Sequence, residues 1–374
     1  MKRLVLLGGG HAHVEVLRDL ALHPDPAREV TLVTPSQRLL YTGMVPGVIA
    51  GHYTIEDCTI DLALLAQRAN AELLLTTASL VSPDANEVAC SDGTALPYDV
   101  LSIDVGSHPA IGDARGVERH AVLMRPLERA VVGWNGVLAR AGRGQVGAVT
   151  IVGAGAAGIE IALAMRHRFN MELRDHRVPH VRIVSEAAGT GIALGAADKL
   201  ILAARRAGVE SHVGFSVKEV GAGFVRLQSG LEFATDAVFW VTGAAAPEWL
   251  RESGLGTDPR GFMLTNLHMQ SVRYANIFGI GDCASVEGHE MPKAGVFAVR
   301  AAPTLAANLR AALSGGILAQ HIPKPRYLAL ISTGKRHAVG TWGDLSWGGW
   351  WAWRWKDRID RKFVARYREA PAKA

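Results

Sequence analysis

The 374-residue chain is predicted to fold as an α/β protein with two Rossmann-like dinucleotide-binding domains, the first interrupted by the second, plus a C-terminal amphipathic tail. Two observations predict this architecture. A pattern of apolar strand, glycine-rich turn, helix and second strand occurs at residues 3–33 and again at 149–184. Hydrophobic residues make up 49% and charged residues 20%, so the chain can bury a large core and is not disordered.

The first unit begins with a short apolar strand and turns at Gly8-Gly9-Gly10. The spacing of Gly8 and Gly10 lets the backbone approach a pyrophosphate at the start of a helix, where amides and the helix dipole favour negative charge. His13 replaces the third glycine of the fingerprint, so the helix must pack differently on the strand. No acid follows the second strand, which ends in the segment 34–38 with Ser36 and Arg38.

The second unit carries the complete fingerprint, Gly153, Gly155 and Gly158. Glu186 follows its second strand, where a carboxylate accepts hydrogen bonds from a ribose 2'-hydroxyl. No Arg lies in the next few residues to receive a 2'-phosphate, so the sequence favours NADH over NADPH. Glu160 lies just past the third glycine, and spacing alone leaves open whether it is a functional group or a solvated acid stabilised by the helix dipole.

Three further apolar runs end on small residues, as a chain must when it passes close under a ligand. A helix is predicted from about 296 to 313, directly after Gly295. The ends of the three runs are expected to contact a ligand, and they are Gly106, Gly243 and Gly281-Asp282.

Several other classes of protein do not fit this sequence. Cys58, Cys90 and Cys283 form no Cys-x-x-Cys pair, which argues against a zinc site or a redox disulfide and makes Cys283 a buried structural thiol. We expect no signal peptide and no membrane-spanning helix, because no apolar stretch reaches 18 residues. His11 and His13 lie two residues apart and point to different faces of a helix, so a packing role is favoured over metal binding.

The tail is basic and aromatic. Residues 354–368 contain seven basic and two acidic residues, an excess equal to the whole net charge of +5, and this uneven placement argues against a nucleic-acid binder. From Trp351 the apolar residues Trp355, Ile359, Phe363 and Tyr367 recur every four positions. This pattern is typical of a helix that lies in a membrane interface. A helix docked on the body of the protein or on a second subunit is the alternative.

In order and spacing, the motifs from residue 1 to about 313 resemble the pyridine nucleotide-disulfide oxidoreductase superfamily. The resemblance implies that the first unit binds FAD, that the inserted second unit binds NADH, and that Asp282 bonds the ribityl chain. Without paired active-site cysteines, the chain looks like the branch of type II NADH dehydrogenases, ferroptosis-suppressor-like quinone reductases and sulfide:quinone reductases. The segment 291–295 is similar to the Pro-Lys-Thr-Gly segment that lies beside the flavin ring in that branch.

More narrowly, residues 8–14, residues 40–47 and the Trp-rich end look like a subfamily that also occurs fused to some selenophosphate synthetases. The strand-end motif that usually reads Ala-Thr-Gly in the superfamily is Asp104-Val105-Gly106 here.

The resemblance implies an FAD-dependent NADH oxidoreductase that passes two electrons to a quinone. Lys293 would stabilise negative charge on the reduced flavin, as a nearby cation should. Glu160 lies where the type II enzymes carry a Glu implicated in quinone reduction, and it would orient the nicotinamide or deliver a proton. The predicted cofactor-binding residues are Gly8, Gly10, His11, Ala12, Ser36, Arg38, Gly106, Gly153, Gly155, Gly158, Glu186, Gly243, Gly281, Asp282 and Gly295, with no metal site.

The predicted division assigns residues 1–115 and 266–322 to the FAD domain, 116–265 to the NAD domain and 323–374 to the tail. We expect a cytoplasmic protein that is peripheral on the inner face of the cell membrane through 342–368. Two alternatives stay open: a flavin reductase for a soluble partner in selenium or sulfur metabolism, and a non-catalytic flavin-based redox sensor. The sequence also leaves a homodimer open.

Overall fold

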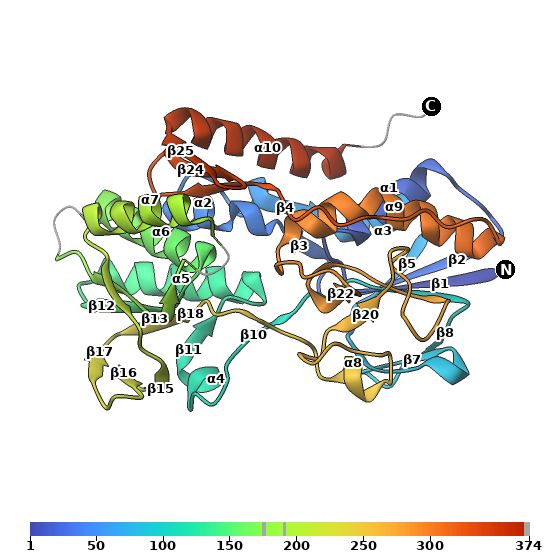
Figure 1. The fold of residues 1–374 in the computed structure, drawn as a ribbon, viewed down its shortest axis with the longest axis horizontal. Coiled ribbons are helices and arrows are strands. Elements are labelled where there is room, and N and C mark those ends of the chain that lie inside the picture. The colour runs from blue at the N-terminus through green and yellow to red at the C-terminus, as the bar shows by residue number, and fades with distance from the viewer. Residues whose placement is uncertain (174–176, 190–191, 370–374) are drawn as a thin grey trace.

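The computed structural model describes residues 1–173, 177–189 and 192–369, and it confirms the predicted fold class (Figure 1). Two five-stranded parallel sheets lie in separate halves of the molecule, and helix α10 (Trp350–Arg368) lies across its top. Two short paired strands, β10 and β19, run between the halves.

The first sheet has the strand order β21-β9-β1-β2-β5, with every neighbouring pair parallel. Its strands read as nearly continuous apolar runs because helices cover both faces of a parallel sheet. Helix α9 (Gly295–Ser314) matches the helix predicted over 296–313. The strands are β1 (Lys2–Leu7), β2 (Arg28–Val33), β5 (Ala71–Leu74), β9 (Val100–Ile103) and β21 (Ile277–Gly279), and the other helices of this half are α1 (His13–Leu22), α2 (Val45–Ala50), α3 (Leu62–Arg68) and α8 (Trp249–Glu252).

The second sheet has the order β11-β18-β12-β13-β14 and is also parallel throughout. Trp134 on its covering helix α5 is fully buried against Phe169 and Phe239, which anchors two layers of this half. The strands are β11 (Ala121–Leu123), β12 (Ala148–Ala154), β13 (His180–Ala188), β14 (Glu210–Val213) and β18 (Ala237–Trp240), and the helices are α4 (Val117–His120), α5 (Leu127–Ala141), α6 (Ala156–Glu172) and α7 (Leu194–Arg206).

Smaller elements complete the two halves. A three-stranded antiparallel meander extends each half, made of β6–β8 in the first and β15–β17 in the second. Their bounds and those of the short pairs are β3 (Arg38–Leu40), β4 (Thr59–Asp61), β6 (Ala78–Ser82), β7 (Glu87–Cys90), β8 (Ala95–Pro97), β10 (His108–Pro109), β15 (Val217–Gly221), β16 (Phe224–Leu227), β17 (Glu232–Ala234), β19 (Ala244–Ala245), β20 (Met263–Thr265) and β22 (Ala284–Val286), with 3-10 turns at Thr42–Met44, Glu56–Cys58, Pro83–Ala85 and Gly281–Cys283.

The C-terminal segment is a folded unit. Strands β23 (Leu328–Ser332), β24 (Ala338–Trp342) and β25 (Leu345–Gly349) form an antiparallel sheet, and α10 packs on it. Ala352, Trp353, Val364 and Tyr367 of α10 belong to the main core. The Tyr367 hydroxyl donates to Glu15 at 2.9 Å, which ties the end of α10 to α1.

The second half of the predicted apolar stripe of the tail is docked on the body of the protein, which is the alternative given for the tail above. Tyr367 is buried and Phe363 is half-buried, with the Phe363 ring stacked on Tyr41 at 4.5 Å. Trp351, Trp355 and Ile359 remain exposed. The helix is docked by one face and still presents aromatic side chains to solvent, so the two alternatives for the tail are not exclusive.

Candidate functional site

The turn between β1 and α1 brings the predicted residues Gly8 and Gly10 close to Gly281, which lies in the 3-10 turn after β21. Gly8 and Gly281 have positive φ values, +91° and +76°, which favour glycine. A side chain on any of the three would collide with one residue, Asp104. Asp104 follows β9, so the ends of three adjacent parallel strands meet here, where open α/β sheets bind ligands.

Asp104 is the centre of this turn. One carboxylate oxygen accepts hydrogen bonds from the backbone amides of Ala12 at 2.8 Å and His13 at 3.2 Å, at the start of α1. Burial raises the pKa of Asp104 to about 6, while the two amides and the neighbouring His11 oppose that rise. In the sequence Asp104 is only a departure from a strand-end motif, and it was not among the predicted site residues.

The two histidines of the turn differ in their surroundings. The ring of His13 is buried and bonded through Nδ1 to the Gly8 carbonyl at 2.6 Å and through Nε2 to Ser102 Oγ at 2.8 Å. Burial lowers its pKa to about 4, so the ring is neutral and structural, as the sequence predicted. His11 lies against the Tyr41 ring, and its Nε2 is buried without a partner among the described residues.

Asp282 is held by an arginine from the other half of the molecule. Arg125, in the loop before α5, places one guanidinium nitrogen 2.8 Å from the Asp282 carboxylate and also donates to Ser107. No local pattern could indicate the role of Arg125, because its contact with Asp282 spans 157 positions. Ser36 and Arg38 lie beyond β2, with the Ser36 hydroxyl donating to the Arg38 carbonyl at 2.9 Å.

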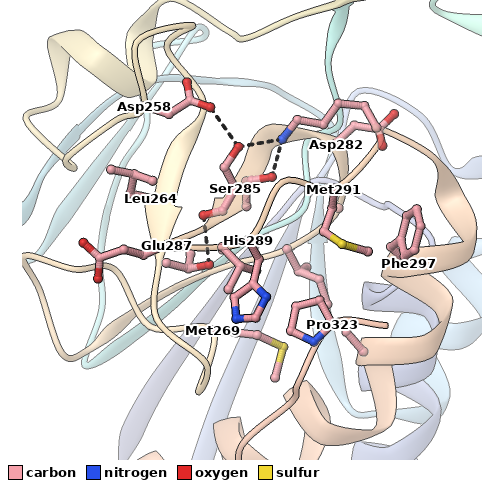
Figure 2. A pocket seen from close by; sticks show the side chains of 18 of the residues that line it. Asp258, Leu264, Met269, Asp282, Ser285, Glu287, His289, Met291, Phe297 and Pro323 are labelled. Carbon is pink, nitrogen blue, oxygen red and sulfur yellow. Dashed lines mark hydrogen bonds between the residues drawn. The ribbon is translucent and has the colours of Figure 1, made fainter. Parts of the chain in front are cut away.

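A cavity of about 1010 Å³ opens beside Asp282, between α9, β20, β22 and the loop 287–294 (Figure 2). Lys293 lines it, but its ammonium group donates to Ser285 Oγ at 3.0 Å and lies 3.9 Å from the centre of the Phe262 ring. Ser285 in turn donates to Asp258 at 2.9 Å, as Figure 2 shows. Burial lowers the pKa of Lys293 to about 8, so the amine titrates close to neutral pH.

The second glycine turn, between β12 and α6, follows its motif closely. Gly153 has a φ of +115° and packs on the Val241 carbonyl, while Gly158 packs on the Gly153 carbonyl, so both positions demand glycine. Gly155 is the N-cap of α6. Gly243 lies just beyond β18, next to this turn.

Glu186 lies in the second half of β13, and its side chain is exposed. Its carboxylate accepts a hydrogen bond of 2.6 Å from the Ser216 hydroxyl. The amides of Gly214 and Phe215 both donate to the Ser185 carbonyl, which fixes this loop beside Glu186. The Phe215 side chain is exposed.

Glu160 is not a solvated acid. It lies on α6 under the C-terminal unit, where its carboxylate accepts the Ser332 amide at 2.6 Å. Burial raises its pKa to about 7, although Lys356 of α10 opposes the rise. Lys356 itself donates to Asp360 at 2.7 Å and to the Gly43 carbonyl at 2.6 Å. Glu160 and Lys293 have different charged neighbours, so the structure does not join the two predicted catalytic residues in one cluster.

The three cysteines are free and buried, which for Cys283 agrees with the predicted structural thiol. Cys283 donates to the Ile280 carbonyl at 3.1 Å, and burial raises its pKa to about 12. Among the described residues no group of three or more His, Cys, Asp or Glu side chains could hold a metal ion. No helix in the described part of the chain is both long and apolar enough to cross a bilayer.

A nucleotide unit that holds a second nucleotide unit inside it, with a Gly-Asp segment returning to the first, defines a two-dinucleotide flavoprotein reductase. The family model for pyridine nucleotide-disulphide oxidoreductases matches residues 2–304, and the chain belongs to this family. It is an FAD-dependent enzyme that takes electrons from NAD(P)H.

Individual relatives agree with this assignment. The chain is 26% identical to a "Probable NADH dehydrogenase" of Dictyostelium discoideum, over 90% of this chain and 80% of the relative. It is 25% identical to a sulfide-quinone reductase of Aquifex aeolicus, over 82% and 76%. Among solved structures, the Aquifex aeolicus sulfide:quinone oxidoreductase has a TM-score of 0.82 at 20% identity, covering 100% of this chain and 93% of that one. NDH2 of Plasmodium falciparum, in complex with NADH, has a TM-score of 0.79 at 15% identity, covering 99% of both.

The residues of the first turn fit FAD. The unpartnered Nε2 of His11 is a buried polar atom that needs a hydrogen-bond partner. A side chain built on Gly106 would meet only open space, so there is room beyond β9. Asp282, Gly106 and His11 follow the three adjacent strands β21, β9 and β1, so all three lie at the same edge of the sheet.

Proposed function

We propose that this chain is an NADH:quinone oxidoreductase of the non-proton-pumping kind that works at a membrane surface. The relatives that carry the names NADH dehydrogenase and NAD(P)H-ubiquinone oxidoreductase support this activity. The observation that carries it in this chain is the half-buried Glu160 carboxylate on α6, which accepts the Ser332 amide and is influenced by Lys356 of the Trp-bearing helix α10.

The bound flavin would supply the electron chemistry, accepting a hydride from NADH and passing two electrons on. The residues of the chain bind, orient and supply protons. The second glycine turn and Glu186 bind NADH, since the start of α6 faces a pyrophosphate and Glu186 can accept the ribose hydroxyls. Gly8, Gly10, His11 and Asp282 hold the flavin nucleotide.

Reduction of a quinone to a quinol requires two protons. Glu160 is suited to supply one, because burial holds its pKa at about 7 and half of the side chains are protonated near neutral pH. Lys356 and Asp360 form a buried ion pair beside it on α10, and Tyr41 lies against the same Asp360. Proton transfer to the acceptor would leave Glu160 negative, and the Lys356 ammonium would stabilise that charge.

The cysteines argue against sulfide oxidation as the main activity, although one relative is a sulfide-quinone reductase. A cysteine that takes part in sulfide oxidation acts as its thiolate, and the raised pKa of the buried Cys283 opposes ionisation. Cys58 and Cys90 are also buried, and burial raises the pKa of both.

The test of Glu160 is its conversion to Gln, measured as NADH:quinone turnover against pH. We expect Glu160→Gln to lower turnover about 10- to 100-fold while NADH still bleaches the bound flavin. The wild-type rate should fall as pH rises through about 7, since the acid form is lost, and the variant should lack this limb. Glu172→Gln, at the exposed end of the same helix, is the matched control. Unchanged turnover in Glu160→Gln would remove the assigned role.

The membrane part of the proposal rests on the exposed apolar residues of the C-terminal unit. They concentrate in the β24–β25 hairpin and the first half of α10, and we name them the tryptophan patch: Trp342, Leu345, Trp350, Trp351, Trp355 and Ile359. Exposed basic residues follow along the helix, at Arg354, Arg358, Arg361 and Lys362. Exposed tryptophans beside cations suit an interface of anionic lipid.

Truncation cannot test the patch, because removing 342–374 would uncover the core residues of α10. A triple substitution of the exposed Trp350, Trp351 and Trp355 by Ser leaves that core intact. We expect it to lose co-sedimentation with anionic vesicles and turnover with long-chain quinone, while reduction of soluble dyes persists. The matched control replaces the exposed Val132 and Leu231 by Ser. Equal vesicle binding by both variants would contradict attachment through the tryptophan patch. The homodimer stays a prediction.

A further inference from the structure

The first glycine turn carries a charged group at the place where a phosphate is expected. Backbone amides at the start of a helix are the donors that a dinucleotide-binding turn offers to a pyrophosphate. Here the amides of Ala12 and His13 already donate to the Asp104 carboxylate, at 2.8 and 3.2 Å. Gly8, Gly10 and Gly281 all pack on the same residue, so it has little freedom to move away.

The charges that face Asp104 do not neutralise it. Asp282 faces it from the 3-10 turn after β21, and its negative charge opposes ionisation of Asp104. His11 faces it from the glycine turn, and burial lowers the pKa of that ring. Arg125 pairs directly with Asp282 rather than with Asp104. The neutral thiol of Cys283 lies close by, in the same 3-10 turn as Asp282.

A bound FAD would add a pyrophosphate to this cluster. The ionised carboxylates of Asp104 and Asp282 and the diphosphate would then share one region with a single guanidinium. That guanidinium belongs to Arg125, which is already paired with Asp282. Like charges at such short range disfavour the ionised form of a carboxyl group, and Asp104, which has no cationic partner among the described residues, is the one that can take up a proton.

We propose that FAD binding by this chain takes up one proton at Asp104, so that a carboxylic acid lies against the pyrophosphate. The proton comes from solvent and forms an O–H bond on Asp104, and no other bond forms or breaks. The unprotonated oxygen still accepts from the α1 amides, and the new O–H donates to a phosphate oxygen. This inference rests on FAD as the cofactor and is independent of the electron acceptor.

The proposal predicts a pH dependence of FAD affinity with a definite sign. Below the pKa of Asp104 in the FAD-free protein, the group is already protonated and affinity does not change. Above it, binding must draw a proton from solution, so the dissociation constant rises up to tenfold per pH unit. With that pKa at about 6, FAD binds up to about fiftyfold more weakly at pH 8 than at pH 6.

The test is dilution of the FAD-loaded full-length protein at pH 5.5 to 8.5, with released FAD measured by its fluorescence. The wild type should release more FAD as pH rises, whereas Asp104→Asn and Asp104→Ala should retain FAD with no pH dependence. Asp99→Asn is the control, since this carboxylate lies just before the same strand and accepts the Arg3 amide at 2.7 Å. The Asp99→Asn variant should show the same increase of FAD release with pH as the wild type.

Two results would overturn the inference. One is a wild-type affinity that does not change with pH, which needs no variant to observe. The other is a pH slope that persists in folded Asp104→Asn. Neither result depends on whether the protein reduces quinone, so a failure here is distinct from a failure of the proposed function.

Discussion

The two glycine turns differ at the start of the helix that follows each of them. The amides at the start of α1 donate to the chain's own Asp104, whereas the first helical turn of α6 contains no acidic residue. The first turn replaces its third glycine by the buried His13, and the second keeps Gly158 packed on the Gly153 carbonyl. At the next strand, the second unit offers the exposed Glu186 and the first offers no acid.

The difference teaches that one motif serves two kinds of ligand here. The first turn is closed by side chains from neighbouring strands and by Arg125 from the other half, which suits a resident cofactor that rarely leaves. The second turn ends in an exposed carboxylate and an open loop, which suits a nucleotide that binds and dissociates in every cycle. The predictions below test this contrast.

The largest expected effect comes from a side chain placed in each turn. Gly10→Val would drive a side chain into Asp104, so we expect the protein to lose nearly all bound FAD. Gly158→Val would separate α6 from β12, so we expect full FAD content with bleaching by NADH slowed about a hundredfold or more. Absorbance of the purified proteins gives the FAD content, and stopped-flow spectroscopy gives the bleaching rate. Equal loss of FAD in both variants would erase the contrast.

A smaller effect is expected at Glu186 and its neighbour Ser216. The Ser216 hydroxyl orients the Glu186 carboxylate, which discriminates against a 2'-phosphate by charge. We expect Glu186→Gln to lower the preference for ADP-ribose over its 2'-phosphate about tenfold, and Ser216→Ala about threefold. Calorimetric titration of the FAD-loaded protein with the two ligands measures this without turnover. Ser211→Ala on β14 should leave the ratio unchanged.

A substitution of Phe215, which is exposed beside Glu186, should change the affinity for both ligands rather than the ratio between the two affinities. If its ring supports the adenine, Phe215→Ala weakens both ligands equally, by about tenfold, and leaves their ratio intact. A shifted ratio would show instead that the loop, rather than the ring, had changed.

The smallest effect is expected at Lys293. Its ammonium group donates to Ser285 and faces Phe262 rather than projecting freely into the cavity, so its field at the flavin is reduced. We expect Lys293→Ala to slow flavin reduction by NADH about two- to fivefold at pH 7. Above pH 8 the wild-type amine itself loses its proton, so the difference in rate between the two proteins should shrink. A rate equal to wild type at pH 7 would remove Lys293 from the catalytic residues.

The sequence was sufficient for the elements that depend on local pattern. Apolar runs predicted the inner strands of both sheets and β21, whereas the edge strands β5, β11 and β14 were not predicted. The predicted helix at 296–313 agrees closely with α9. His13 and Cys283 were correctly assigned to structural roles, because a buried ring and a thiol without a partner cysteine suit packing.

The features of the site that the sequence did not predict depend on contacts between residues that are far apart in the sequence. Arg125 reaches Asp282 across 157 residues, and Glu160 meets Ser332 across 172, so no local pattern could show either contact. Asp104 did leave a signal, an acid where the family motif has a small residue, but its position against the α1 amides required the sheet order. The pattern of the tail could not decide between membrane binding and docking, because the second half of the stripe docks while the first half stays exposed.

The most direct measurement is the visible spectrum of the FAD-loaded protein under anaerobic conditions, before and after NADH, and again after a quinone is added. We expect NADH to bleach the flavin bands, NADPH to do so much more slowly, and quinone to restore them. A flavin spectrum that NADH leaves unchanged, or that quinone fails to restore, would contradict the proposed activity.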